Sequence, residues 1–197
     1  LATLGRERIV AAVGEMGQAG VRWIQLRLKA PATDAELYEL ASACAREARS
    51  AGVRLWIDDR ADLALLVGAD GVHVGQGDLS PAAARRVLGS SCWIGQSTHD
   101  LEQLRRADTD PDVDIIAFGP VFPTASKALT DPVVGLETLR QARGATRKPL
   151  VAIGGIAADR LEAVRAAGAD SIAVINALCQ GDVGANARRL LAHLERR

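Results

Sequence analysis

The stretch "LVGADGVHVG" (residues 66–75) places a glycine after an apolar, helix-like segment, and a short β-branched run follows within a few residues. Glycine is the usual helix stop because it adopts the left-handed C′ conformation at little cost. The same order recurs at three other places, namely "QAGVRWIQLR" (18–27), "SAGVRLWIDD" (50–59) and "AAGADSIAVI" (166–175). Four copies of one helix-to-strand link indicate stacked βα units.

Three further apolar runs continue this rhythm and bring the predicted strands to seven: "SCWIGQS" (91–97), "VDIIAFG" (113–119) and "KPLVAIGG" (148–155). Runs without polar alternation are typical of strands buried on both faces of a parallel sheet. Helices are expected around them, at 5–19, 34–51, 60–68, 80–89, 100–108, 136–143, 159–168 and 183–196. The pattern predicts an α/β protein in which residues 1–197 form a single (β/α)₈ TIM barrel domain. Because the chain starts with a helix, the first strand of that barrel is missing from it.

Composition narrows the class of partner. Lysine plus arginine and aspartate plus glutamate both number 24, so no net field would attract nucleic acid or an anionic membrane. No apolar run is long enough to span a membrane, and no signal peptide is visible. The three cysteines lack CxxC spacing, which argues against disulfides and zinc and suits a reducing cytoplasm. We expect a cytoplasmic enzyme with small-molecule substrates, and a homodimer remains open.

Polar side chains gather where the predicted strands end. Asp59 ends the stretch 50–59, and Asp78 comes shortly after the stretch 66–75. Each thus lies at the carboxyl end of a predicted strand, and in a parallel barrel both would face one point above its mouth. Two such carboxylates repel unless a proton or cation lies between them, and an oxygen-only pair suits Mg²⁺. The alternative, that each aspartate only caps the following helix, also fits the spacing.

Two cations follow the neighbouring strand. In "RLK", Arg27 and Lys29 are alternate residues and would point the same way. Cations beside a metal held by carboxylates can bind a diphosphate and stabilise it as it departs. The alternative is an ordinary pair of solvated charges.

A second anion site is expected across the mouth. "AIGGI" (152–156) and "INAL" (175–178) end the last two predicted strands. Loops at these positions of a barrel frequently bind phosphate through backbone N–H groups, and Gly154 and Gly155 let the backbone approach closely. Two anion sites at one mouth suggest an enzyme that joins two phosphorylated molecules or transfers a group between them.

Six stretches resemble motifs of the thiamine phosphate synthase family, also called thiamine-phosphate pyrophosphorylase: "IQLRLK", "DDRADLAL", "GADGVHVGQGDL", "IGQSTHD", "FGPVFPTASK" and "VAIGGI". They occur in the family's order, and the resemblance extends from about residue 8 to about residue 180. It implies a (β/α)₈ barrel transferase of thiamine biosynthesis, of the EC 2.5.1.3 type, with Mg²⁺ as cofactor. Such an enzyme joins 4-amino-5-hydroxymethyl-2-methylpyrimidine diphosphate to 4-methyl-5-(2-hydroxyethyl)thiazole phosphate, giving thiamine phosphate and diphosphate.

The resemblance also implies roles for individual residues. Asp59 and Asp78 would ligate Mg²⁺, and Gln25 and Asp58 would lie beside the pyrimidine. The residues implied to contact the diphosphate and to act in catalysis are Arg27, Lys29, Ser97 and Lys127. The residues implied to meet the thiazole phosphate are Thr124, Ser126, Gly155, Ile175 and Asn176. Loss of diphosphate would leave a pyrimidine-methyl cation, which the thiazole nitrogen captures.

Four residues depart from the family's pattern. Asp58 stands where asparagine is usual, Leu28 replaces a frequent glutamate, Ser126 replaces threonine, and Asn176 stands where serine is usual. Two alternatives therefore stay open. One is the related thiazole tautomerase, with His99 of "STHD" as proton-transfer residue. The other is a non-catalytic paralogue that binds thiamine precursors. The aspartate pair, "RLK" and "PTASK" favour the synthase.

The sequence also indicates where His73 and the three tryptophans lie. His73 in "DGVHVG" is expected at the barrel mouth, where either structural hydrogen bonding or substrate contact would suit it. The three tryptophans fall in predicted strands and are expected to pack in the interior rather than stack on a pyrimidine.

Overall fold

The computed structural model describes residues 4, 6–28, 31–124 and 131–195. Its strands are β1 (Trp23–Leu26), β2 (Arg54–Asp58), β3 (Gly71–Val74), β4 (Trp93–Thr98), β5 (Ile115–Phe118), β6 (Leu150–Ala152) and β7 (Ser171–Ile172). Its helices are α1 (Arg6–Gln18), α2 (Asp34–Ser50), α3 (Ala61–Val67), α4 (Pro81–Leu88), α5 (Leu101–Thr109), α6 (Gly135–Ala145), α7 (Leu161–Ala166), α8 (Asn176–Cys179) and α9 (Val183–Glu195). A 3₁₀ turn, η1 (Ala158–Arg160), precedes α7.

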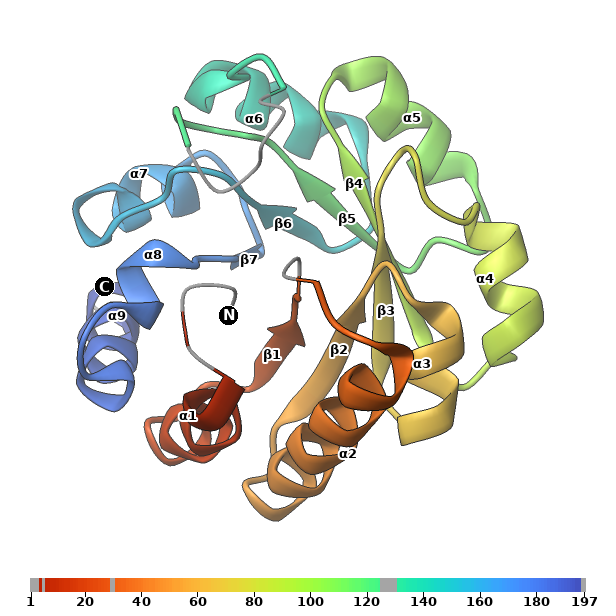
Figure 1. Cartoon of the computed structure of the whole chain (residues 1–197). Helices are drawn as coiled ribbons and strands as arrows, with labels where there is room; N and C mark the ends of the chain where they lie inside the picture. The colour runs from red at the N-terminus through yellow and green to blue at the C-terminus, as the bar shows by residue number, and fades with distance from the viewer. Residues whose placement is uncertain (1–3, 5, 29–30, 125–130, 196–197) are drawn as a thin grey trace.

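The seven predicted strands are confirmed, and each pairs in parallel with its neighbour in chain order from β1 to β7. The sheet curls, and the helices surround its outer face (Figure 1). Within the described part of the chain no strand joins the edge strands β1 and β7, so this is an open curled sheet and not a closed eight-stranded barrel. The helix layer nevertheless continues across the opening, because α1 packs against α9.

The helix predictions are confirmed with two differences. The expected helix at 159–168 divides into η1 and α7, and the short helix α8 lies outside every predicted range. A four-residue helix shows too little periodicity to be recognised in a sequence. Helices α2, α4 and α5 have side-chain N-caps, since Thr33, Ser80 and Asp100 each accept a backbone N–H.

The core lies between the sheet and the helices, and it is aliphatic. Outward-facing residues such as Ile24, Leu55, Ile94 and Phe118 are buried there with the inner sides of the helices. Side chains alternate across a strand, so the residues between them face the inside of the curl. The fold thus leaves an inner face that can carry polar groups without disturbing this core.

The three tryptophans lie on that inner face. Trp23 stacks on Trp56 with ring centroids 5.4 Å apart and meets the edge of Trp93 at 5.9 Å. Trp56 is buried, and Gly71 leaves room for it, because a Cβ on Gly71 would lie 2.6 Å from the indole. The prediction that the tryptophans pack in the interior is confirmed for Trp56, whereas Trp23 and Trp93 are exposed, at 44% and 39%.

Aspartates lock the amino ends of the strands. In three places an aspartate just before or at the start of a strand accepts a backbone N–H of the preceding strand at 2.8 Å: Asp70 from Leu55, Asp114 from Ile94, and Asp170 from Leu150. Arg85 donates to Asp114, and Arg143 donates to Asp170. These contacts fix strand register at the amino ends of the sheet.

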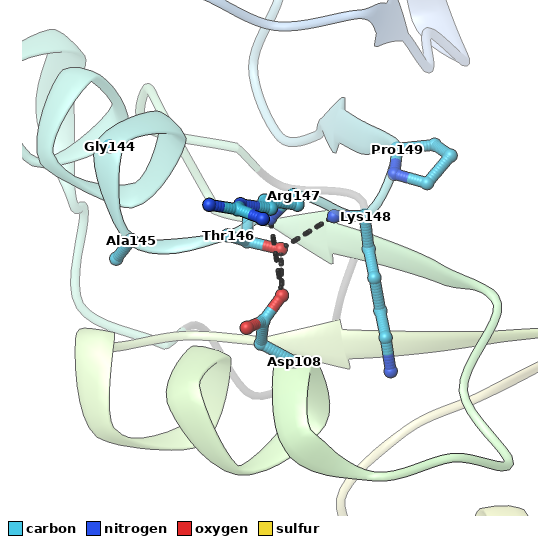
Figure 2. Close-up of a pocket in the computed structure, with 7 residues that line it drawn as sticks. All are labelled: Asp108, Gly144, Ala145, Thr146, Arg147, Lys148 and Pro149. Carbon is cyan, nitrogen blue, oxygen red and sulfur yellow. Dashed lines mark hydrogen bonds between the residues drawn. The ribbon is translucent and has the colours of Figure 1, made fainter.

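A cavity of about 600 Å³ lies at the same end, lined by Asp108 and residues 144–149. Figure 2 shows the Thr146 hydroxyl facing the Asp108 carboxylate, to which it donates. The Lys148 ammonium donates to the backbone oxygens of Ala107 and Asp110 at the end of α5. Burial lowers the pKa of Lys148, and the Thr146 hydroxyl holds the pKa of Asp108 below its usual range. These groups satisfy one another, as structural contacts do.

The three cysteines are buried and free, as the sequence predicts. Burial raises the pKa of the Cys44 thiol to about 11, so Cys44 supplies no reactive thiolate near neutral pH. None of the helices in the described residues combines the length and apolar character needed to cross a membrane.

Candidate active site at the carboxyl ends of the strands

The site starts with a contact between the first two strands. Gln25 points to the inner face of β1, and its Nε2 donates to Asp58 Oδ1 at 2.6 Å. Arg27 Nε lies 3.2 Å from Asp58 Oδ2. The Asp58 side chain is only 9% exposed, and that of Arg27 is 19% exposed, so this ion pair is well shielded from water. The sequence predicts these three residues at one rim, and the structure brings them into direct contact.

Asp59 follows β2 in a left-handed conformation, with φ of 62°. This conformation is uncommon for a residue with a side chain and costs free energy, so the surrounding contacts must hold it. Its N–H donates to the backbone oxygen of His73 at 2.8 Å, which ties the end of β2 to β3. The neighbouring Arg60 guanidinium is paired with Asp34 and Asp62.

The helix-capping alternative for the two aspartates is wrong. Helix α3 has Arg60 at its N-cap position, with no side-chain cap, and α4 is capped by Ser80. The Asp78 carboxylate instead accepts the backbone N–H of Gly75 at 2.8 Å, within the turn that follows β3. Asp59 and Asp78 therefore follow adjacent strands without the structural role that their spacing also allowed.

His73 and Ser97 meet on the inner face of β3 and β4. His73 Nε2 lies 2.8 Å from Ser97 Oγ, and Gln76 Nε2 donates to the backbone oxygen of Ser97 at 2.7 Å. Ser97 is 6% exposed. Of the two expectations for His73, structural hydrogen bonding is confirmed, and the contact lies beside Asp58, which is the register partner of His73.

Three predicted site residues, Lys29, Ser126 and Lys127, lie outside the described residues. Thr124 is the last described residue before the second of these gaps, and it is partly buried. The segment leading to it is fixed by backbone bonds, since Val121 and Phe122 donate to Ile153 and Gly154. Residues 121 and 122, shortly after β5, are therefore held against the end of β6.

The glycine pair after β6 has the close contacts that the sequence predicts. Gly154 and Gly155 have φ of 89° and 65°. A Cβ on Gly155 would lie 2.4 Å from the backbone oxygen of Pro123, so no larger residue fits without displacement. Ile175 and Asn176 begin the short helix α8, where the Ile175 carbonyl accepts the N–H of Leu178 and of Cys179.

Sequence reasoning missed Arg160. Its guanidinium lies 4.4 Å from the centre of the Phe122 ring and donates to the Gly155 carbonyl at 2.8 Å. It thereby links η1 to the loops after β5 and β6. A single arginine at the start of a predicted helix gives no motif signal, so nothing in the sequence separates it from a solvated charge.

His99 has both ring nitrogens beside protein acceptors. Nδ1 lies 2.6 Å from the Gly119 carbonyl oxygen, so it carries the proton and donates. Nε2 lies 3.4 Å from Asp131 Oδ2. The ring joins the end of β4 to the two flanks of the loop after β5, which is a structural arrangement.

Comparisons with known proteins identify the family of the chain. The family model described as thiamine monophosphate synthase matches residues 2–178. The chain belongs to this family. The expectation drawn from the sequence motifs is thus confirmed at the level of the family.

Named relatives lead to the same family. A thiamine-phosphate synthase of Koribacter versatilis is 56% identical over 123 residues, which are 62% of this chain and 58% of that protein. Another, of a Synechococcus strain, is 44% identical over 190 residues, which are 96% of this chain and 53% of that protein. The chain thus spans little more than half the length of these curated relatives. The solved thiamine phosphate pyrophosphorylase of Pyrococcus furiosus is 34% identical with a TM-score of 0.87, covering 95% of this chain and 89% of that one.

Proposed function

We propose that this chain is the synthase domain that condenses 4-amino-5-hydroxymethyl-2-methylpyrimidine diphosphate with 4-methyl-5-(2-hydroxyethyl)thiazole phosphate. The products are thiamine phosphate and diphosphate. The observation that carries the proposal is a pair of adjacent side-chain contacts at one rim of the sheet. Asp58 contacts Gln25 and Arg27, and its register partner His73 contacts Ser97. These contacts occur in a chain of the thiamine monophosphate synthase family.

In this proposal, the residues of the first four strands hold the pyrimidine diphosphate. Arg27 and Lys29 bind the diphosphate, and Ser97 and Lys127 donate to its oxygens. Stabilising the departing diphosphate is the chief catalytic task, because loss of that group generates the pyrimidine-methyl cation. The protein contributes charge and alignment, and no side chain has to remove a proton before the thiazole nitrogen attacks.

Mg²⁺ is proposed to be held by Asp59 and Asp78. Their oxygen donors fit the ion, which typically uses one or two carboxylates together with water and substrate phosphates. Within the described residues there is no cluster of three or more histidine, cysteine or acidic side chains that would suit a closed metal cage. When bound, the ion would neutralise charge on the diphosphate. The strained backbone of Asp59, held by the His73 carbonyl, supports a functional use of that position.

The thiazole phosphate is proposed to bind across the mouth. Thr124 and Ser126 would offer hydroxyl groups, and the backbone at Gly155, Ile175 and Asn176 would offer N–H groups. The close packing of Gly155 against Pro123, and the bond from Arg160 to the Gly155 carbonyl, support a preformed loop there. This position faces the diphosphate residues across the inner face of the sheet.

The tautomerase alternative loses its main support. Proton transfer to a substrate needs a ring nitrogen that the substrate can reach. Both nitrogens of His99 already lie beside Gly119 and Asp131. The non-catalytic alternative rested on Asp58 and Asn176, and Asp58 has a definite role in holding Gln25 and Arg27.

We also propose the finer features expected from the sequence. The complete barrel has an eighth strand between β7 and β1. The exposed Trp23 and Ser171 on these edge strands, and the packing of α1 on α9, support that closure.

Three buried free thiols support a reducing, cytoplasmic location. Exposed Leu65, Leu66 and Val87 on the packed helices α3 and α4 support a homodimer, which light scattering would test.

Diphosphate release by the purified protein tests the function. Both substrates are supplied with Mg²⁺, and each is then omitted, or EDTA is added. Metal-dependent release that requires both substrates is expected. Release without the thiazole phosphate would contradict a synthase. Isomerisation of a thiazole carboxylate phosphate that survives EDTA and is lost in His99→Ala would instead establish the tautomerase.

A further inference from the structure

Asp58 contacts the two side chains that are expected to meet the pyrimidine diphosphate. Its Oδ1 accepts from Gln25 Nε2 at 2.6 Å, and its Oδ2 lies 3.2 Å from Arg27 Nε. With 9% of its side chain exposed, this carboxylate has little contact with water. Its two oxygens are thus occupied by one amide and one guanidinium from the neighbouring strand.

This contact fixes the orientation of the Gln25 amide. A carboxylate paired with a guanidinium accepts hydrogen bonds and donates none. If the amide were turned over, Gln25 Oε1 would face Asp58 Oδ1 at the same short distance, and two acceptors would repel. The amide therefore keeps Nε2 toward Asp58 and Oε1 on its other side. Asp58 is the one hydrogen-bond partner of Gln25 among the described residues, so Oε1 is left for a ligand.

We infer that Asp58 is a specificity-determining positioning residue, which makes Gln25 present an acceptor to the pyrimidine and so selects a ring with an exocyclic amine. An amine donates to Oε1, whereas a ring carbonyl at that position would set acceptor against acceptor. The inference rests on the proposed function, which puts the pyrimidine beside Gln25. An asparagine at position 58 can donate as well as accept, so it would allow both orientations of the amide and discriminate less.

The charge of Asp58 has a separate effect, which the test must remove. Asp58→Asn would leave Arg27 less neutralised and strengthen its attraction for any diphosphate. That change acts equally on two ligands that carry the same diphosphate. The ratio of their dissociation constants therefore reports the orientation of the amide, and the mean affinity reports the charge.

The experiment measures binding by calorimetry, with Mg²⁺ and without thiazole phosphate, for the whole chain. The two ligands are 4-amino-5-hydroxymethyl-2-methylpyrimidine diphosphate and its 4-oxo analogue. Wild-type protein is expected to prefer the amino ligand by roughly 10- to 100-fold, the usual penalty for one mispaired buried group. Asp58→Asn is expected to lower that preference to roughly threefold or less, from the same principle. Asp62→Asn, an exposed carboxylate on α3, is the matched control and keeps the wild-type ratio.

Gln25→Met provides a second test that leaves Asp58 in place. It removes both polar atoms of the amide at similar volume, so the preference should also fall. An unchanged ratio in either Asp58→Asn or Gln25→Met would overturn the inference, even if both affinities moved together. If the wild-type protein bound neither ligand, the proposed function would fail and this inference with it. Binding of both ligands with equal affinity by the wild type would overturn the inference alone.

Discussion

The two ends of the sheet use the same residue type in different ways. At the amino ends, Asp70, Asp114 and Asp170 each accept a backbone N–H of the preceding strand, and Asp114 and Asp170 also accept arginine N–H groups. At the carboxyl ends, aspartates contact side chains, lie in a strained conformation or remain exposed: Asp58, Asp59 and Asp78. A carboxylate that satisfies backbone groups of a neighbouring strand stabilises the fold. A carboxylate held by the proposed site residues would shape a site, and (β/α)₈ barrels usually divide stability and function between their two ends in this way.

The surroundings of the two ends of the sheet also differ. The cavity beside Asp108 is lined by groups that satisfy one another, such as the Thr146 hydroxyl and the Asp108 carboxylate (Figure 2). The Lys148 ammonium donates to the backbone oxygens of Ala107 and Asp110. At the opposite rim, Gly155 approaches a backbone oxygen so closely that only glycine fits. Substitutions at the amino ends should therefore change stability, and substitutions at the carboxyl ends should change activity.

The largest effect is expected for Asp59→Asn. Asparagine tolerates a φ of 62°, so the backbone is kept while the charge is lost. If Asp59 holds Mg²⁺, kcat/KM should fall about 100- to 1,000-fold, with the free energy of unfolding changed by less than about 0.5 kcal/mol. Steady-state diphosphate release and urea unfolding measure the two quantities. Wild-type kcat/KM in this variant would remove Asp59 from the site and weaken the contrast between the two ends.

Gly155→Ala is expected to change both the enzyme kinetics and the free energy of unfolding. The left-handed conformation and the contact with Pro123 together should lower the free energy of unfolding by about 3 kcal/mol. The displaced loop should also raise KM for the thiazole phosphate more than KM for the pyrimidine diphosphate. Gly144→Ala is the matched control, because Gly144 lies in α6 with nothing near its Cβ position. That change should be neutral or stabilising.

Asp114→Ala should reduce stability by about 2 kcal/mol, since it leaves the Ile94 N–H and the Arg85 guanidinium without this acceptor. Asp112→Ala is the control at the same arginine, where the contact is longer, 3.6 Å, and no strand N–H is involved. Urea unfolding should separate the two variants. A fall in kcat for the folded Asp114→Ala protein would break the division between a stabilising end and a functional end.

The smallest effect is expected for Thr146→Val, about 1 kcal/mol at neutral pH from the loss of its hydrogen bonds. The hydroxyl lowers the pKa of Asp108 in the folded state below its ordinary value of 3.8. The stabilisation is therefore present above that value and is lost as the pH falls through the folded pKa. The free energies of unfolding of the wild-type protein and of Thr146→Val should differ at pH 7 and converge in acid. Thr109→Val, on the exposed side of α5, should show no such dependence.

Much of the fold could be predicted because its signals are local. A glycine after an alanine-rich helix and a β-branched run within a few residues define each βα unit wherever it lies in space. The seven strands follow from such short patterns.

The site could be predicted only as a set of residues at one rim. The sequence left Asp59 and Asp78 as either caps or ligands, and it missed Arg160. Capping depends on the residue at which the helix begins, and here α3 and α4 begin after Arg60 and Ser80, one and two residues beyond the aspartates. The contact of Arg160 with Phe122 depends on how two loops pack, and neither loop has a periodic pattern.

The sequence by itself determined the order of βα units and the chemistry available at their carboxyl ends. The tertiary structure alone decided which of those groups meet. Gln25 and Asp58 are 33 residues apart, and their hydrogen bond exists because β1 and β2 pair in one particular register. His99 likewise meets Gly119 and Asp131 across two loops. Turns and periodicity are properties of neighbouring residues, whereas side-chain partners depend on strand register and loop packing that no short stretch of sequence contains.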